Sequence, residues 1–139
     1  GGPGAGTVNL PARQWKSYLG VADHPEYPSG SSCFCAAHAQ ASRRFLGSDA
    51  LGWVVPYAKG SSVVEPGITP AADTALGFPT WSQWEQVCAQ SRLWGGVHFQ
   101  AAIDAAKPMC RQIGNIAHGF VTRHIDGQVL ARVADDARE

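Results

Sequence analysis

The sequence carries no excess of charge of either sign. Eleven Lys and Arg residues balance eleven Asp and Glu residues in a chain of 139 residues, so the formal net charge is zero. Proteins that bind nucleic acids or anionic membranes through bulk charge have a basic excess, and this composition argues against both partners. The sequence also has no apolar run near the roughly 20 residues that cross a bilayer, so we expect no membrane span.

Cysteine is scarce, with residues only at positions 33, 35, 88 and 110. An even count permits two disulfides in an oxidising compartment. We favour the simpler interpretation, in which all four are small buried apolar residues. Cys33, Cys35 and His38 resemble metal ligands, but their spacing lacks the paired knuckles of a structural zinc site. A zinc-binding module is therefore the least favoured function.

The sequence also lacks an initiating methionine and a recognisable signal peptide, since it begins with Gly1. We expect a processed, trimmed or partial product whose length suits one domain. Residues 1–20 are predicted to form a flexible lead-in and a short helix, residues 21–114 the helical domain, and residues 115–139 a C-terminal extension that ends in a polar tail.

Hydrophobic periodicity predicts three main helices. The first spans residues 31–46 and stops at Gly47. The second begins after Thr80, which forms a capping-box pattern with Gln83, and ends at residues 95–96. The third lies within residues 99–113, and Pro108 predicts a kink in it or a late start. The residues expected on the buried faces are Phe34, Ala37, Ala41 and Phe45 in the first helix, Trp81, Trp84, Val87, Cys88 and Trp94 in the second, and Ala102, Ala106, Met109, Cys110 and Ile113 in the third.

The connecting segments have weaker signals. Residues 48–79 contain four prolines and no sustained period, which indicates a long irregular loop between core helices, with a short strand at residues 61–65. Asp126 and Gly127 suggest a turn, such as that of a hairpin.

Two stretches carry the chemistry. Residues 25–32, Pro-Glu-Tyr-Pro-Ser-Gly-Ser-Ser, form a defined turn that leads into a helix start, where free backbone amides bind anions. Residues 91–99 supply a cation, Arg92, and an imidazole, His98. We interpret the two stretches as facing one another across an anion pocket.

These stretches resemble the second and third motifs of the vanadium-dependent haloperoxidase and type 2 phosphatidic acid phosphatase superfamily. Residues 91–98 contain every fixed position of Ser-Arg-x-x-x-Gly-x-His, and residues 28–31 follow Pro-Ser-Gly-His except that Ser31 replaces the histidine. The segments 65–71, 79–81 and 111–114 are similar to the haloperoxidase-like branch.

The resemblance implies an all-α fold, a partial helical bundle that holds vanadate or phosphate. Arg92 would bind the equatorial oxygens, since a guanidinium fork suits a tetrahedral oxyanion. His98 would be the axial ligand of vanadium or the nucleophile on phosphorus. Ser29, Gly30 and Ser31 would donate hydrogen bonds to the anion. The candidate catalytic residues are thus His98 and Arg92.

Two departures from the family pattern direct the functional interpretation. Ser31 cannot carry a proton at neutral pH as histidine does, and the upstream Lys and Arg of the first motif are absent. We therefore interpret the chain as a degenerate domain, catalytically impaired and kept as a structural or interaction subunit with a protein partner. The alternative is a vanadate-dependent haloperoxidase or acid phosphatase completed by an upstream segment.

Other residues leave simpler alternatives open. Arg92 could instead form a structural ion pair with Asp104 or Glu85. The remaining histidines match no motif and are expected at the surface or in turns; they are His24, His38, His118 and His124.

A secreted or organellar location is favoured over the cytoplasm, because the family is often exported and the cysteine count is even.

Overall fold

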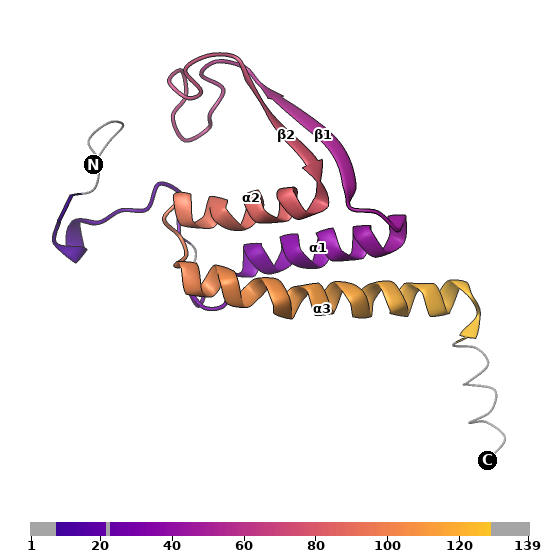
Figure 1. The fold of residues 1–139 in the computed structure, drawn as a ribbon. Coiled ribbons are helices and arrows are strands. Elements are labelled where there is room, and N and C mark those ends of the chain that lie inside the picture. Colours follow the sequence, from indigo (N-terminus) through magenta and orange to yellow (C-terminus); the bar gives the residue numbers. More distant parts are fainter. Residues whose placement is uncertain (1–7, 22, 129–139) are drawn as a thin grey trace.

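The computed structural model describes residues 8–21 and 23–128, so the predicted lead-in at residues 1–7 and the tail at residues 129–139 lie outside the described residues. Within the described part, three α-helices dominate (Figure 1): α1 (Gly30–Leu46), α2 (Trp81–Trp94) and α3 (Gln100–Ile125). A short 3₁₀ helix (Ala12–Gln14) precedes them, and two strands, β1 (Ala50–Tyr57) and β2 (Thr74–Thr80), join α1 to α2.

The three helices form a layer with α1 between the other two (Figure 1). Helix α1 packs most extensively against α3 and then against α2, whereas α2 and α3 barely touch. The core is built mainly from small residues, which let helix backbones approach closely: Ala36, Ala39, Ala89, Ala102, Ile103, Ala106 and Cys110.

The buried face of α1 differs from the prediction. Phe34 and Phe45 are each 79% exposed, and the buried positions of the helix are Ser32, Ala36 and Ala39. Small side chains are buried in α1 because two neighbouring helices pack closely against it, whereas both phenylalanines remain largely exposed. Met109 and Ile113, also expected inside, are about half exposed.

The predicted stop of α1 at Gly47 and the predicted start and end of α2 are confirmed. The Ser29 hydroxyl caps α1 by accepting a hydrogen bond from the amide of Ser32. Gly47 ends α1 in the left-handed conformation, with φ of 63°. Thr80 caps α2 by accepting from the amide of Gln83, and Gly95 follows its last residue. These signals are local, so the sequence alone carries them.

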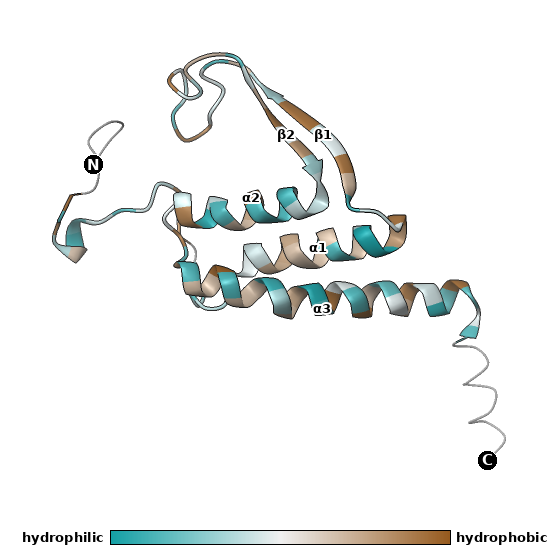
Figure 2. Cartoon of the chain, in the orientation of Figure 1, coloured by the Kyte–Doolittle hydropathy of each residue, from teal (hydrophilic) through white to brown (hydrophobic). Residues whose placement is uncertain are grey.

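Helix α3 is longer than predicted. It has 26 residues, contains Pro108 and continues to Ile125, so the predicted end at Ile113 is wrong. Asp126 and Gly127 close this helix and form no hairpin within the described residues. Figure 2 shows hydrophobic residues recurring along α3 to its C-terminal turns, where several are exposed: Ile116, Phe120, Val121 and Ile125. None of the helices in residues 8–21 and 23–128 is long and apolar enough to span a membrane.

Residues 50–80 form a β-hairpin where the sequence indicated a long irregular loop with a short strand at residues 61–65. Strands β1 and β2 pair antiparallel, with Trp53 opposite Phe78 and Tyr57 opposite Thr74. The described fold is therefore helical with a two-stranded sheet, not all-α, and residues 61–65 are not a strand. Pro56 is tolerated because each strand of a two-stranded ribbon has a free edge.

The loop between the strands, residues 58–73, is linked to the N-terminal segment. The hydroxyl of Tyr18 donates a hydrogen bond of 2.9 Å to Glu65, and Thr69 donates to the same oxygen. The hydrogen bonds from Thr69 and Tyr18 hold the pKa of Glu65 below its ordinary value, and the carboxylate raises the pKa of Tyr18. Glu65 therefore remains an acceptor at neutral pH.

Two disulfides connect α1 to its neighbours. Cys33 bonds to Cys110 on α3, with Cα atoms 5.0 Å apart, and Cys35 bonds to Cys88 on α2, with Cα atoms 6.4 Å apart. The preferred interpretation of four unpaired cysteines is thus wrong. Cys33 and Cys35 are two residues apart, which is a rotation of roughly 200° about the helix axis. Their side chains therefore lie on nearly opposite sides of α1, and each reaches a different neighbouring helix.

Helices α1 and α3 approach one another closely at Gly114. A Cβ atom there would meet the carbonyl oxygen of Ala37 at 2.5 Å. We expect Gly114→Ala to lower the free energy of unfolding by about 1–3 kcal/mol, because the helix backbones must separate. The measurement is urea-induced unfolding followed by circular dichroism.

Gly119 provides the matched control in the same helix. Its added Cβ would meet only the end of the Arg123 side chain, at 3.4 Å. Gly119→Ala is expected to raise the free energy of unfolding by roughly 0.5–1 kcal/mol through helix propensity. Equal effects of the two substitutions would contradict the close contact.

Candidate functional site

The loop before α1 and the loop after α2 meet at one end of the helical layer. The amide of Ser29 donates to the carbonyl of Ala102, at 3.1 Å, which fixes the first loop on α3. The Ser29 hydroxyl is buried and accepts hydrogen bonds from the amide and the hydroxyl of Ser32. Ser29 is therefore mainly the structural cap of α1, with its own hydroxyl proton available for donation.

His98 is the buried residue at the centre of this region. Its side chain is only 1% exposed. The Nδ1 atom lies 2.7 Å from the carbonyl oxygen of Glu26. Since a carbonyl only accepts hydrogen bonds, we assign the proton to Nδ1, which leaves the lone pair of Nε2 available.

Three of the predicted site residues line one cavity. Gly30, Ser31 and His98 share a cavity of about 280 Å³ with residues of the preceding loop, namely His24, Pro25, Tyr27 and Pro28. Gly30 is the first residue of α1, and nothing lies within 4 Å of where its Cβ would be. The open space thus adjoins a helix N-terminus, which favours an anion.

Arg92 lies in the last turn of α2, near His98 along the chain. Its carbonyl accepts hydrogen bonds from the amides of Val97 and His98, at 3.1 and 3.3 Å. Its Nε atom is buried and has no hydrogen-bond partner among the described residues. Arg92 is not among the residues that line the cavity with Gly30 and Ser31.

The structural alternative for Arg92 has no support in the described part of the chain. Glu85 pairs with Arg43 and Arg111, and Asp104 pairs with Lys107. Neither carboxylate forms an ion pair with Arg92. A buried Nε donor without a partner carries a desolvation cost that a hydrogen bond to an anion would offset.

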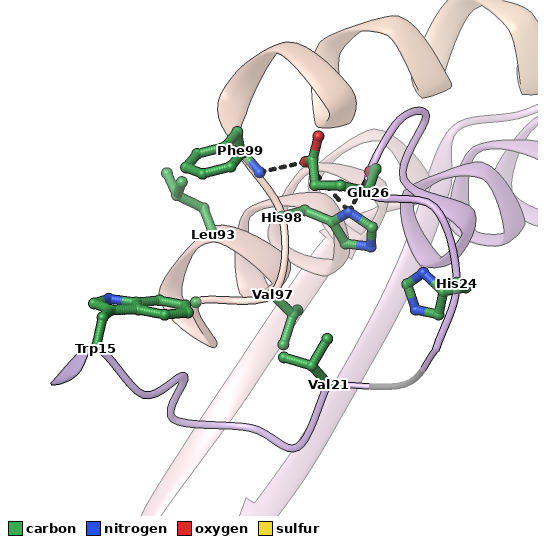
Figure 3. A pocket seen from close by; sticks show the side chains of 9 residues that line it. Trp15, Val21, His24, Glu26, Leu93, Val97, His98 and Phe99 are labelled. Carbon is green, nitrogen blue, oxygen red and sulfur yellow. Dashed lines mark hydrogen bonds and ion pairs between the residues drawn. The ribbon is translucent and has the colours of Figure 1, made fainter. Parts of the chain in front are cut away.

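A second cavity of about 310 Å³ lies against His98 and is mainly apolar (Figure 3). Trp15 closes part of it by packing on Gly96, where a Cβ atom would meet the indole ring at 3.1 Å. Gly96 also has φ of 68°, which favours glycine. The apolar lining residues are Trp15, Val21, Leu93, Val97 and Phe99.

Sequence reasoning missed two residues of the site, His24 and Glu26. The ring of His24 stacks on that of His98, with centroids 5.6 Å apart, and lines both cavities. Glu26 contacts His98 across 72 residues of sequence. Glu26 lies within the stretch of residues 25–32 that the sequence indicated, but no role was predicted for its side chain, and His24 was expected at the surface or in a turn.

The donors at this site suit an oxyanion better than a bare cation. They comprise two imidazoles, those of His24 and His98, a helix N-terminus, a serine hydroxyl and a nearby guanidinium. Within residues 8–21 and 23–128, no group of three or more His, Cys, Asp or Glu residues could hold a metal ion.

Comparison with known proteins identifies relatives of the chain. The family model of the VCPO second helical-bundle domain matches residues 1–127. Two solved structures, a holo-type and an apo-type bacterial vanadium-dependent chloroperoxidase, are each 52% identical over 88% of this chain, with TM-scores of 0.81. The matches cover 26% and 27% of those chains, so this chain spans about a quarter of their length. No curated protein matches the sequence significantly.

Proposed function

Because the chain belongs to the family of VCPO second helical-bundle domains, within the vanadium haloperoxidase superfamily, we propose that it forms part of the vanadate site of a vanadium-dependent haloperoxidase. The observation that carries the proposal is the cavity where Gly30, Ser31 and His98 meet. The unpartnered Nε of Arg92 adds to it. We favour this function over the catalytically impaired domain that the sequence suggested.

The side chains fit the chemistry of a bound oxyanion. His98 offers the Nε2 lone pair, because Nδ1 is engaged by Glu26. The amide of Gly30 and the hydroxyl of Ser31 are donors at the start of α1, and Arg92 adds a permanent positive charge. Vanadate, when bound, supplies the Lewis acidity that activates peroxide toward halide.

Ser31 limits what this part of the site can do. A hydroxyl donates a hydrogen bond to an oxyanion but does not exchange a proton at neutral pH, whereas a general acid or base typically accelerates a step by about 10²–10⁴-fold. We propose that Ser31 orients the anion and that any proton transfer uses another group.

The remainder of the site would come from the rest of a longer protein. An oxyanion with several negative charges would be held more tightly by several cations than by Arg92 alone. The exposed apolar surface of α1 and α3, which includes Phe34, Phe45 and Phe120, is suited to packing against that remainder. The same surface also favours the second candidate function, a structural or interaction domain without catalysis.

A secreted or organellar location also remains a proposal. The two disulfides, Cys33–Cys110 and Cys35–Cys88, support it, because such bonds persist mainly in oxidising compartments. Mass spectrometry of the protein from its native source, without reductant, would show the mass of the fully oxidised chain.

Calorimetric titration with orthovanadate tests the proposed site. We expect saturable binding by the chain. Arg92→Ala should weaken it by about tenfold to a hundredfold, the loss of a charge-assisted hydrogen bond of roughly 1.5–3 kcal/mol. His98→Ala should weaken it comparably, because the lone pair of Nε2 is lost.

Arg44→Ala and His118→Ala are matched controls, since both residues lie on the helices away from the two cavities. Both should bind as the unmodified chain does. A chain that is folded by circular dichroism and binds no orthovanadate, or an Arg92→Ala variant with unchanged affinity, would favour the structural domain instead.

A further inference from the structure

Glu26 holds His98 from two directions. Its carbonyl oxygen accepts the hydrogen bond from Nδ1 of His98 at 2.7 Å. Its carboxylate accepts from the next amide, that of Phe99, also at 2.7 Å, and lies 3.5 Å from Nδ1 (Figure 3). One residue thus fixes both the imidazole ring and the peptide that carries it.

The bond to the carbonyl determines which nitrogen of His98 is free. With the proton on Nδ1, the lone pair is on Nε2. A ring without this bond would exchange between two tautomers and two orientations. Since the His98 side chain is only 1% exposed, water cannot readily replace the lost partner, and the cost of breaking the bond is high.

The carboxylate keeps the carbonyl in place. Phe99 is the N-cap of α3 and has no side-chain cap of its own. The Glu26 carboxylate satisfies its amide and lies at the positive end of the helix dipole, where a negative charge is favoured. The loop of residues 25–28 is thereby clamped to the start of α3, next to its other anchor at Ser29 and Ala102.

Glu26 is not itself a lining residue of the proposed oxyanion cavity. It lines the apolar cavity on His98, whereas the other cavity is lined by Gly30, Ser31 and the preceding loop. A carboxylate that faced an anion would repel it. The Glu26 carboxylate instead contacts His98 and the start of α3, so it does not occupy the groups that would donate to the anion.

We infer that Glu26 is a positioning residue for His98, which sets the Nδ1–H tautomer and aims Nε2 at the oxyanion. The inference rests on the proposed function for what His98 binds, but the clamp itself does not depend on it. Partners that orient a ligating histidine typically change affinity by about 10–100-fold when removed.

Nitrogen-15 NMR of histidine-labelled chain, at a pH where the rings are neutral, tests the clamp directly. We expect the unmodified chain to show His98 as the Nδ1–H tautomer. Glu26→Ala should give a mixture of tautomers and about tenfold weaker orthovanadate binding. Glu26→Gln should behave as the unmodified chain, because its amide oxygen still accepts from Phe99.

Glu65→Ala serves as the control, since Glu65 is another carboxylate that accepts hydrogen bonds but lies in the loop between the strands. It should leave the His98 spectrum unchanged. If Glu26→Ala fails to fold, Glu26→Asp replaces it, because the shorter side chain withdraws the carboxylate from Phe99.

The outcomes separate this inference from the proposed function. The inference would be overturned if His98 kept a single Nδ1–H tautomer in a variant that lacks the Phe99 contact. It would also be overturned if His98 lost the single tautomer in Glu26→Gln. If the unmodified chain binds no orthovanadate, the proposed function fails while the tautomer spectra still decide the role of Glu26.

Discussion

Removing the Cys33–Cys110 disulfide is expected to lower the free energy of unfolding by about 4–5 kcal/mol. The bond joins residues 77 positions apart, so it removes much of the conformational freedom of the unfolded chain. It also links α1 to α3, the pair of helices with the most extensive contact. A domain of this size is stable by only about 5–15 kcal/mol, so this bond is a large part of the total.

The double substitution Cys33→Ala with Cys110→Ala measures this contribution by urea unfolding. Cys35→Ala with Cys88→Ala, whose residues are 53 positions apart, should cost about 4 kcal/mol in the same model. The unmodified chain in excess reductant should unfold at a lower urea concentration than either double variant without reductant. An unchanged midpoint in reductant would show that the disulfides contribute nothing to stability.

The sequence predicted the features that depend on neighbouring residues. The cap at Thr80, with its bond to Gln83, and the stop at Gly47 each depend on residues within about one helical turn, so their patterns are visible in the sequence. The motif of residues 91–98 is also local: the turn at Gly95 and Gly96 returns the chain so that the amide of His98 bonds to the carbonyl of Arg92.

The features that the sequence did not predict depend on residues far apart. Trp53 and Phe78 face each other across the hairpin, and neither segment shows the regular alternation of a strand. The disulfide pairing requires knowing which sides of α1 its neighbours occupy. The exposure of Phe34 and Phe45 likewise follows from where α2 and α3 lie, which the periodicity of α1 alone does not reveal.

The sequence predicted three candidate residues of the site, but not the residue that holds His98 in position. The motifs indicated Gly30, Ser31 and His98, which line one cavity. Glu26 escaped notice because its role is to join two loops, and a glutamate between two prolines has no chemical signature of its own. Candidate binding residues are thus easier to find in a sequence than the residues that hold them in position.

The second large effect concerns Glu85, a carboxylate buried among all three helices. Its side chain is 0% exposed and forms ion pairs with Arg43 of α1, at 3.1 Å, and Arg111 of α3, at 2.8 Å. Arg43 also bonds to Gln40 and lies 3.7 Å from Asp49. The arginines reach solvent in part, whereas Glu85 does not, so the carboxylate is the group that depends on its partners.

Replacing both arginines, Arg43→Met with Arg111→Met, should therefore cost about 3–5 kcal/mol in the free energy of unfolding, because it leaves a buried charge without compensation. Adding Glu85→Leu to this pair should restore most of the loss, since an apolar group of similar volume needs no partner. Urea unfolding of the double and triple variants measures both steps. A triple variant that is no more stable than the double variant would mean that the arginines act through their own packing, and not by neutralising Glu85.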